Sequence, residues 1–207
     1  MPQTLLNTTQ TDLLEWTTVT ANAAPVISSV LDCSNKISAR LGIQVGLEST
    51  TAPVGTQILV QRSNQATGNE DWYTIDTIIT GTVSAVATTT DAVETAGSTL
   101  VECGAAVPAL NDLVFFKNAT IANSEIGRVI ARVTTGGSET FTLLDALTNT
   151  QAQGTYYNKA EVFDRLYTLE GASRLRCVVN NNYAATAATA SVKITCMTCD
   201  SVKVVAA

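Results

Sequence analysis

The sequence has no histidine, few aromatic residues and few charges. Of its 207 residues, 5% are aromatic and 14% are charged. Histidine is the commonest general base and the commonest metal ligand, so its absence removes the Ser-His and Cys-His nucleophile pairs. The sequence also lacks a G-x-S-x-G elbow, a P-loop and a G-x-G-x-x-G motif. These absences predict a protein that is not an enzyme and that binds no cofactor and no metal.

Two classes of partner are not supported by the charge and hydropathy patterns. The net charge is −6 and no cluster of Lys and Arg occurs, so the electrostatic footprint of a nucleic-acid-binding protein is missing. No run of apolar residues approaches the length of about eighteen that a membrane span needs. The first residues, MPQTLLNTTQTDLLEW, have neither a charged start nor an apolar stretch typical of a signal peptide. We therefore expect the chain to fold in the cytoplasm.

The five cysteines are odd in number and scattered in spacing, so we expect reduced, buried thiols that act as small hydrophobic side chains. Cys196-x-x-Cys199 is the one pair that suggests a metal or redox site. Zinc needs four ligands, and no second such pair is present. An i, i+3 spacing within a strand also places the two thiols on opposite faces. Packing in the core is the favoured interpretation.

Residues 36–48, KISARLGIQVGLE, carry the clearest structural signal. Every second residue is apolar, which is typical of a strand with one buried face. Shorter segments of the same character predict further strands at 15–22, 25–32, 56–62, 72–80, 100–107, 112–117, 127–134, 140–144, 173–180 and 189–198. The sequence therefore predicts an all-β fold, an antiparallel β-sandwich of jelly-roll-like form.

The composition changes after Gly81, where large apolar residues become rare, and the alternating pattern returns near the C-terminus. This favours an outer sandwich built from 1–81 and 165–207, with 82–164 as a small inserted β-barrel-like unit. Surface loops tolerate such insertions because the entropy of loop closure grows slowly with length. A single continuous β domain is the simpler alternative and stays open.

Candidate contacts with a partner lie at the N-terminus and in loops. Residues 1–15 are interpreted as an arm or an edge segment, because Pro2 and the polar run NTTQT oppose a helix. Its apolar side chains can lie on the same domain or on a neighbouring subunit. Together with three loop tyrosines, the candidate partner contacts are Leu5, Leu13, Leu14, Trp16, Tyr156, Tyr157 and Tyr183.

Three segments of the predicted sandwich carry a resemblance to a known family: VLDCSNKISARLGIQV (30–45), TQILVQRSNQATGNEDWYTI (56–75) and RLRCVVNNNYAATAATASVKIT (174–195). They resemble β-sandwich structural proteins in the virions of tailed bacteriophages. The middle segments ALNDLVFFKNAT (109–120) and GRVIARVTTGGSETFTLLD (127–145) are similar to small barrel units that recur in phage structural proteins. The resemblance covers most of the chain and brings no catalytic residues with it.

This resemblance implies a capsid decoration, or cement, protein that binds the lattice of the major capsid protein and stabilises the shell. It further implies location in the virion after folding in the host cytoplasm, and assembly as a homo-oligomer. A tail, neck or baseplate component is the alternative within the virion. A receptor- or carbohydrate-binding module is a second alternative, with its site formed by loops 64–70 and 180–186.

Overall fold

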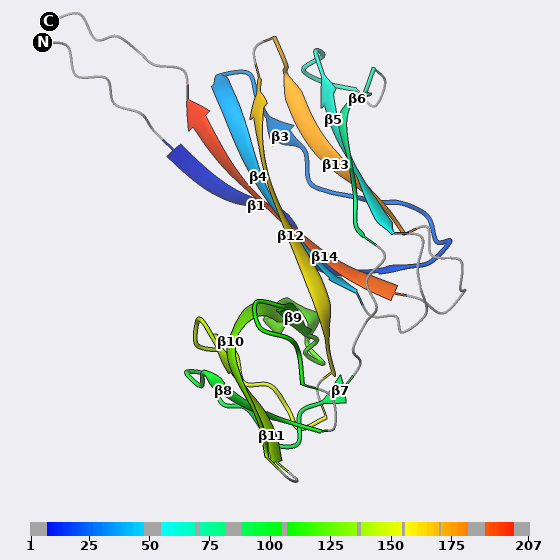
Figure 1. Cartoon of the computed structure of the whole chain (residues 1–207). Coiled ribbons are helices and arrows are strands. Elements are labelled where there is room, and N and C mark those ends of the chain that lie inside the picture. Colours follow the sequence, from blue (N-terminus) through cyan, green and yellow to red (C-terminus); the bar gives the residue numbers. More distant parts are fainter. Residues whose placement is uncertain are drawn as a thin grey trace, which may run out of the picture.

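The alternating segments of the sequence form two antiparallel sheets in the computed structural model (Figure 1). The structure describes residues 8–47, 55–68, 71–81, 88–104, 107–135, 138–154, 156–169, 171–181 and 189–200. Within these ranges the only helical element is a short 3-10 turn, Ile121–Asn123. No helix in the described part of the chain is long and apolar enough to cross a membrane. The expected all-β fold with an antiparallel sandwich is confirmed.

The larger sheet has nine strands among the described residues, and the smaller sheet packs on one end of it. The larger sheet runs in the order β1 (Thr8–Thr20), β14 (Thr189–Asp200), β4 (Lys36–Leu47), β12 (Tyr156–Thr168), β9 (Leu113–Phe116), β10 (Glu125–Thr135), β11 (Ser138–Leu143) and β8 (Leu100–Cys103), with β7 (Thr88–Thr89) paired to β12. The smaller sheet runs β2 (Val26–Ile27), β13 (Arg174–Asn181), β5 (Thr56–Ser63) and β6 (Tyr73–Ile79), with β3 (Leu31–Asp32) also paired to β13.

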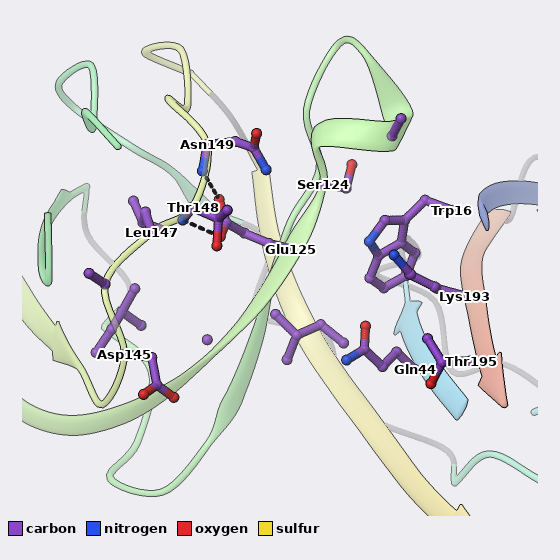
Figure 2. Close-up of a pocket in the computed structure, with 15 residues that line it drawn as sticks. Trp16, Gln44, Ser124, Glu125, Asp145, Leu147, Thr148, Asn149, Lys193 and Thr195 are labelled. Carbon is purple, nitrogen blue, oxygen red and sulfur yellow. Dashed lines mark hydrogen bonds between the residues drawn. The ribbon is translucent and has the colours of Figure 1, made fainter. Parts of the chain in front are cut away.

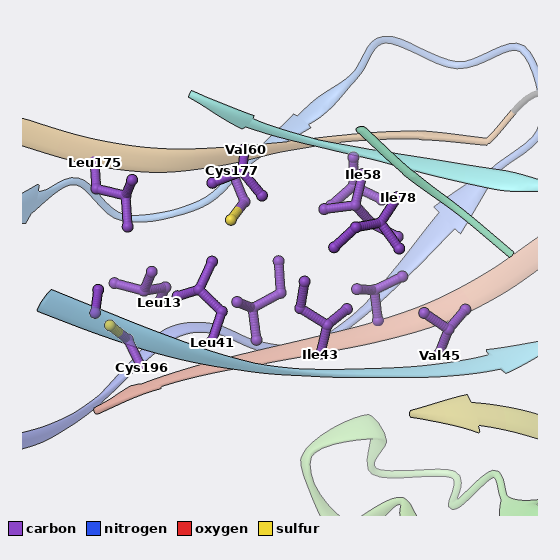
Figure 3. Close-up of a cluster of buried hydrophobic side chains, with 14 of the residues drawn as sticks. Leu13, Leu41, Ile43, Val45, Ile58, Val60, Ile78, Leu175, Cys177 and Cys196 are labelled. Atoms are coloured by element: carbon purple, nitrogen blue, oxygen red, sulfur yellow. The ribbon is translucent and has the colours of Figure 1, made fainter. Parts of the chain in front are cut away.

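The sandwich core lies between the smaller sheet and strands β1, β14, β4 and β12 (Figure 3). Leu41, Ile43 and Val45 project from β4 toward Ile58 and Cys177 of the opposite sheet, and all five side chains are fully buried. Burying one large aliphatic side chain contributes about 1.5–3 kcal/mol. The predicted alternation of 36–48 therefore corresponds to the buried face that holds the two sheets together.

A second hydrophobic core fills the part of the chain between β8 and β11, which forms the lower unit in Figure 1. Phe116 and Phe141 stack with ring centroids 6.4 Å apart, and Val101, Val129 and Leu143 surround them. The strands β10 and β11 form a hairpin in which Thr135 pairs with Ser138. We call residues 88–154 the small unit.

Strand β12 links the small unit to the sandwich without interruption, and its existence was not predicted. Its first residues, Tyr157 to Lys159, pair with β9, and Ala160 to Thr168 pair with β4. The boundary expected between residues 164 and 165 falls inside this strand. Charged residues interrupt the alternation of the segment KAEVFDRLYT, so its periodicity does not indicate a strand.

The N-terminal segment is an edge strand from Thr8 onward. Thr8 pairs with Cys199 and Thr20 pairs with Thr189, so β1 follows β14 along its whole length. Residues 8–15 are therefore part of the sandwich and do not form a detached arm. Residues 1–7 of the expected arm lie outside the described residues.

Candidate functional site

A cleft of about 380 Å³ separates the sandwich from the small unit (Figure 2). Trp16, Gln44 and Lys193 line it on the sandwich side, from strands β1, β4 and β14. On the opposite side it is lined by Glu125 of β10 and by the turn that follows β11, residues 145–149. Residues far apart in the sequence meet here because β12 carries the small unit past the end of β4.

Aromatic packing fixes the floor of this cleft. The rings of Trp16 and Phe115 lie 4.9 Å apart between centroids, tilted by 44°. Phe115 also covers Gly46 so closely that a Cβ atom at position 46 would lie 2.3 Å from Phe115 Cγ. Glycine is therefore required at this point of β4. We call the cluster of Trp16, Phe115 and Ala160 the seam, since it joins the small unit to the sandwich.

Two acidic side chains, Glu125 and Asp145, line the cleft, and Glu125 is already engaged within the small unit. The carboxylate of Glu125 accepts hydrogen bonds from the backbone N–H groups of Thr148 at 2.8 Å and Asn149 at 3.1 Å (Figure 2). It also accepts one from Nε2 of the fully buried Gln151, at 2.8 Å. Glu125 thus holds the 145–149 turn in place, which is a structural role.

The basic side chain of the cleft is neutralised by the edge strand. Lys193 Nζ lies 3.5 Å from a carboxylate oxygen of Glu15 and 3.9 Å from one of Asp12. Within the described ranges, no group of three or more acidic or cysteine side chains is arranged to hold a metal ion. The cleft therefore offers shape and hydrogen-bonding groups, and two of its three charged side chains, Glu125 and Lys193, already have partners.

The sandwich side of the cleft continues into an open sheet surface, which we call the outer face. It is the side of β1, β14, β4 and β12 that points away from the sandwich core. Its centre is a shallow depression of about 300 Å³ over Gly42, where a Cβ atom would lie 2.8 Å from Thr195 Oγ1. The outer face is defined by Gln10, Arg40, Gly42, Val162, Asp164, Leu166, Thr195 and Met197.

Exposed apolar side chains line this depression or lie beside it on the outer face. Val162, Leu166 and Met197 are exposed, and Leu166 is 72% accessible, the highest value among the exposed large apolar residues of the described chain. Arg40 Nε donates to the Asp164 carboxylate at 2.7 and 3.0 Å, and these bonds lower the pKa of that carboxyl. An apolar rim around one fixed ion pair is a surface suited to contact with another protein.

The predicted partner contacts are distributed over several environments. Leu13 is 2% exposed in the sandwich core and Trp16 is 5% exposed in the seam, so burial within this chain leaves them no surface for a partner. Leu14 is half-buried against the sandwich core. Tyr156 and Tyr157 begin β12, where their backbones pair with β7. Leu5 and Tyr183 lie outside the described residues.

The exposed residues of the outer face were missed by sequence reasoning. Val162 and Leu166 belong to the unpredicted strand β12. Met197 had a usable signal, because the alternation of 189–198 places Cys196 inward and hence Met197 outward. A sheet face can be recognised only once all its strands and their order are known, and that order links both ends of the chain.

The loop end of the sandwich is held by arginine and aromatic contacts. Two guanidinium carbons lie over the ring of Trp72, that of Arg174 at 4.8 Å and that of Arg176 at 4.1 Å from its centroid. Arg174 also donates to the carbonyl oxygens of Gln65 and Gly68, each at 2.7 Å. Trp72 is thus engaged within the chain, which disfavours its use as a stacking platform for a sugar.

Four of the five cysteines are buried, as the sequence predicts, and Cys199 is the exception. Cys33, Cys177 and Cys196 are buried in the sandwich core, and burial raises the pKa of each thiol, to about 12, about 12 and about 11. Cys199 is half-buried and lies on the opposite face of β14 from Cys196. Thiols with such raised pKa values stay protonated at neutral pH and act as small apolar side chains.

No family model matches the chain, and no curated protein matches it. Two solved structures, both viral, are weakly similar. The structure of infectious bursal disease virus, Gx strain, has a TM-score of 0.22 and 7% identity, and the match covers 96% of this chain and 43% of that one. VP17, a capsid protein of bacteriophage P23-77, has a TM-score of 0.17 and 11% identity, covering 97% of this chain and all of that one. TM-scores this low do not establish a shared fold or a shared function.

Proposed function

We propose that the chain is a non-enzymatic structural protein of a virus particle, and specifically a capsid decoration protein of a tailed bacteriophage. In this proposal the outer face binds the lattice of the major capsid protein and stabilises the shell. The observation that supports it most is the outer face itself, an open sheet surface with exposed Val162, Leu166 and Met197. The resemblance of the sequence to phage virion proteins supports the same assignment.

The chemistry of the cleft agrees better with binding than with catalysis. A general acid or base needs a titratable group whose proton can be moved within reach of a substrate. Glu125 is held by three hydrogen bonds to its own unit, and Lys193 by two carboxylates. The sequence also supplies no histidine to serve in their place.

The test is binding of the purified chain to capsid shells that lack it, measured by co-sedimentation. We expect saturable binding at a constant ratio to the major capsid protein. Met197→Glu places a charge on the outer face and should weaken binding by at least about tenfold if that face is the contact. Val133→Glu is the matched control, because Val133 is similarly exposed but belongs to β10 of the small unit.

Two results would contradict the proposal. Shells that bind none of the wild-type chain would remove capsid decoration and leave the tail, neck or baseplate alternatives to be tested with those assemblies. Equal binding by both variants and the wild type would show that the outer face is not the contact surface.

A further inference from the structure

The C-terminal part of β12 is an open sheet edge. From Ala160 to Thr168 the strand pairs with β4 on one side, in continuous register and without a bulge. Among the described residues, no strand pairs with its other side over these positions, whereas β9 pairs with the preceding residues 157–159. A regular nine-residue edge presents a row of backbone donors and acceptors that another strand can pair with.

The other edges of the described sheets are disrupted or covered. The pairing of β1 contains two register shifts, and Ser29 N donates to Leu13 O on its free side. β8 is covered by a backbone hydrogen bond from Asp91 N to Glu102 O. β6 is shorter, and its pairing with β5 contains a register shift. Natural proteins use such features to prevent edge-to-edge association, and of the protective features β12 carries only charged side chains over residues 160–168.

The side chains of β12 are complementary to a second copy of the same strand. When two antiparallel copies are related by a two-fold axis at Phe163, Glu161 lies opposite Arg165 of the second copy. The same pair occurs again on the other side of the axis, and Phe163 lies opposite Phe163. Opposite charges and aromatic pairs directly across an antiparallel pair are stabilising. This register also places Leu166 opposite Ala160, and Val162 opposite Asp164, of the second copy.

The two adjacent registers that keep each side chain on its own face lack the pairs between Glu161 and Arg165. An axis at Asp164 places two aspartates opposite each other, and like charges in directly opposed positions are destabilising. An axis at Val162 places Glu161 opposite Phe163 and so leaves the carboxylate without an opposed cation. The side chains of Arg165 and Glu161 are both placed to form the pairs of the favoured register. Arg165 is exposed, with its guanidinium carbon 5.9 Å from the Phe163 ring centroid. Glu161 accepts from Gly81 N at 3.0 and 3.1 Å, and a carboxylate has further acceptor sites for an arginine.

We propose that two copies of this chain associate through residues 160–166 of β12, in antiparallel pairing about a two-fold axis at Phe163, so that their large sheets form one continuous sheet. A two-fold interface requires the same patch to be complementary to itself, as the exchange of Glu161 and Arg165 allows. The proposal does not depend on capsid binding, because the pairing partner is the chain itself.

The experiment measures the mass of the purified full chain by sedimentation equilibrium, in the absence of any capsid. We expect a dimer for the wild type. Arg165→Glu places two glutamates opposite each other at both ends of the interface and should weaken dimerisation by at least about a hundredfold. The double variant Glu161→Arg with Arg165→Glu restores opposite charges and should restore the dimer, which loss of folding would not allow.

Three outcomes would overturn this proposal. The wild type stays monomeric up to its solubility limit, or Arg165→Glu dimerises as strongly as the wild type, or the double variant stays monomeric although it folds. Each is distinguishable from failure of capsid binding, since Met197 lies two strands away from the β12 edge and its variant is measured on shells.

Discussion

The sandwich and the small unit bury their apolar residues in different ways. The sandwich core is entirely aliphatic or cysteine in its buried members, and it joins residues as distant as Leu13 and Cys196 (Figure 3). The core of the small unit is smaller, is drawn from residues 101–147, and contains two stacked phenylalanines. The difference indicates that the sandwich depends on long-range pairing of both ends of the chain, whereas the small unit depends on local hairpins, two rings and the seam.

The largest effect is expected from Phe141→Ala in the small unit. Removing a fully buried phenylalanine costs about 3–5 kcal/mol of unfolding free energy. Because this core is separate from the sandwich core, hydrogen exchange should rise in β10 and β11 while β5 and β13 stay protected. Equal loss of protection in all four strands would contradict the separation of the two cores.

Leu41→Ala should cost about 2–5 kcal/mol in the sandwich core. Leu41 is fully buried in β4, which pairs with both β14 and β12. Denaturant unfolding followed by hydrogen exchange should show loss of protection in β14 and β13 at lower denaturant than in the wild type. If β13 and β14 kept their protection and the loss were confined to β9–β11, Leu41 would not be part of the sandwich core.

Gly46→Ala tests the seam that connects the two regions. The added methyl group would enter the ring of Phe115, and overpacking of this kind costs about 1–3 kcal/mol. Gly42→Ala is the matched control on the same strand, since its methyl group meets only the Thr195 hydroxyl. Thermal unfolding should show the larger loss for Gly46→Ala. Equal losses would indicate that Phe115 does not lock the small unit onto β4.

The smallest effect is expected from Glu94→Gln in the small unit, and it depends on pH. Glu94 is 6% exposed, and burial raises the pKa of its carboxyl above the ordinary value of 4.5. The folded protein therefore binds this proton more tightly than the unfolded chain, and the associated stability is complete below pH 4.5 and is lost as pH rises through the folded pKa.

The glutamine keeps an oxygen that can accept the bond from Glu102 N, at 2.7 Å in the wild type, and it carries no charge. Glu94→Gln should therefore melt at a higher temperature than the wild type at pH 7, with the difference disappearing below pH 4.5. A difference of the same size at both pH values would contradict burial as the cause.

Much of the fold could be predicted from residue periodicity. The segment 36–48 corresponds to β4, and the segments 56–62 and 189–198 correspond to β5 and β14 within a few residues. Periodicity predicts these strands because one face of each strand is buried and the other faces solvent. It failed for β12, since an edge strand with Glu161, Asp164 and Arg165 lacks the clean alternation of a half-buried strand.

The candidate site was much less predictable. Leu13 and Trp16 look like exposed arm residues in the sequence, yet one faces the sandwich core and the other the seam. Their burial depends on pairing with a strand more than 170 residues away. The outer face depends on the same long-range order. Met197 of β14 and Leu166 of β12 lie on one sheet face because both strands pair with β4, which lies between them.

The most direct test of the proposed role is the number of copies per virion, measured by quantitative mass spectrometry of purified particles and normalised to the major capsid protein. Decoration of the shell predicts a copy number close to a fixed simple ratio of the capsid protein. A small number, as in a ring of low cyclic symmetry, would contradict decoration and favour the tail, neck or baseplate. Absence from the particles would contradict a virion role altogether.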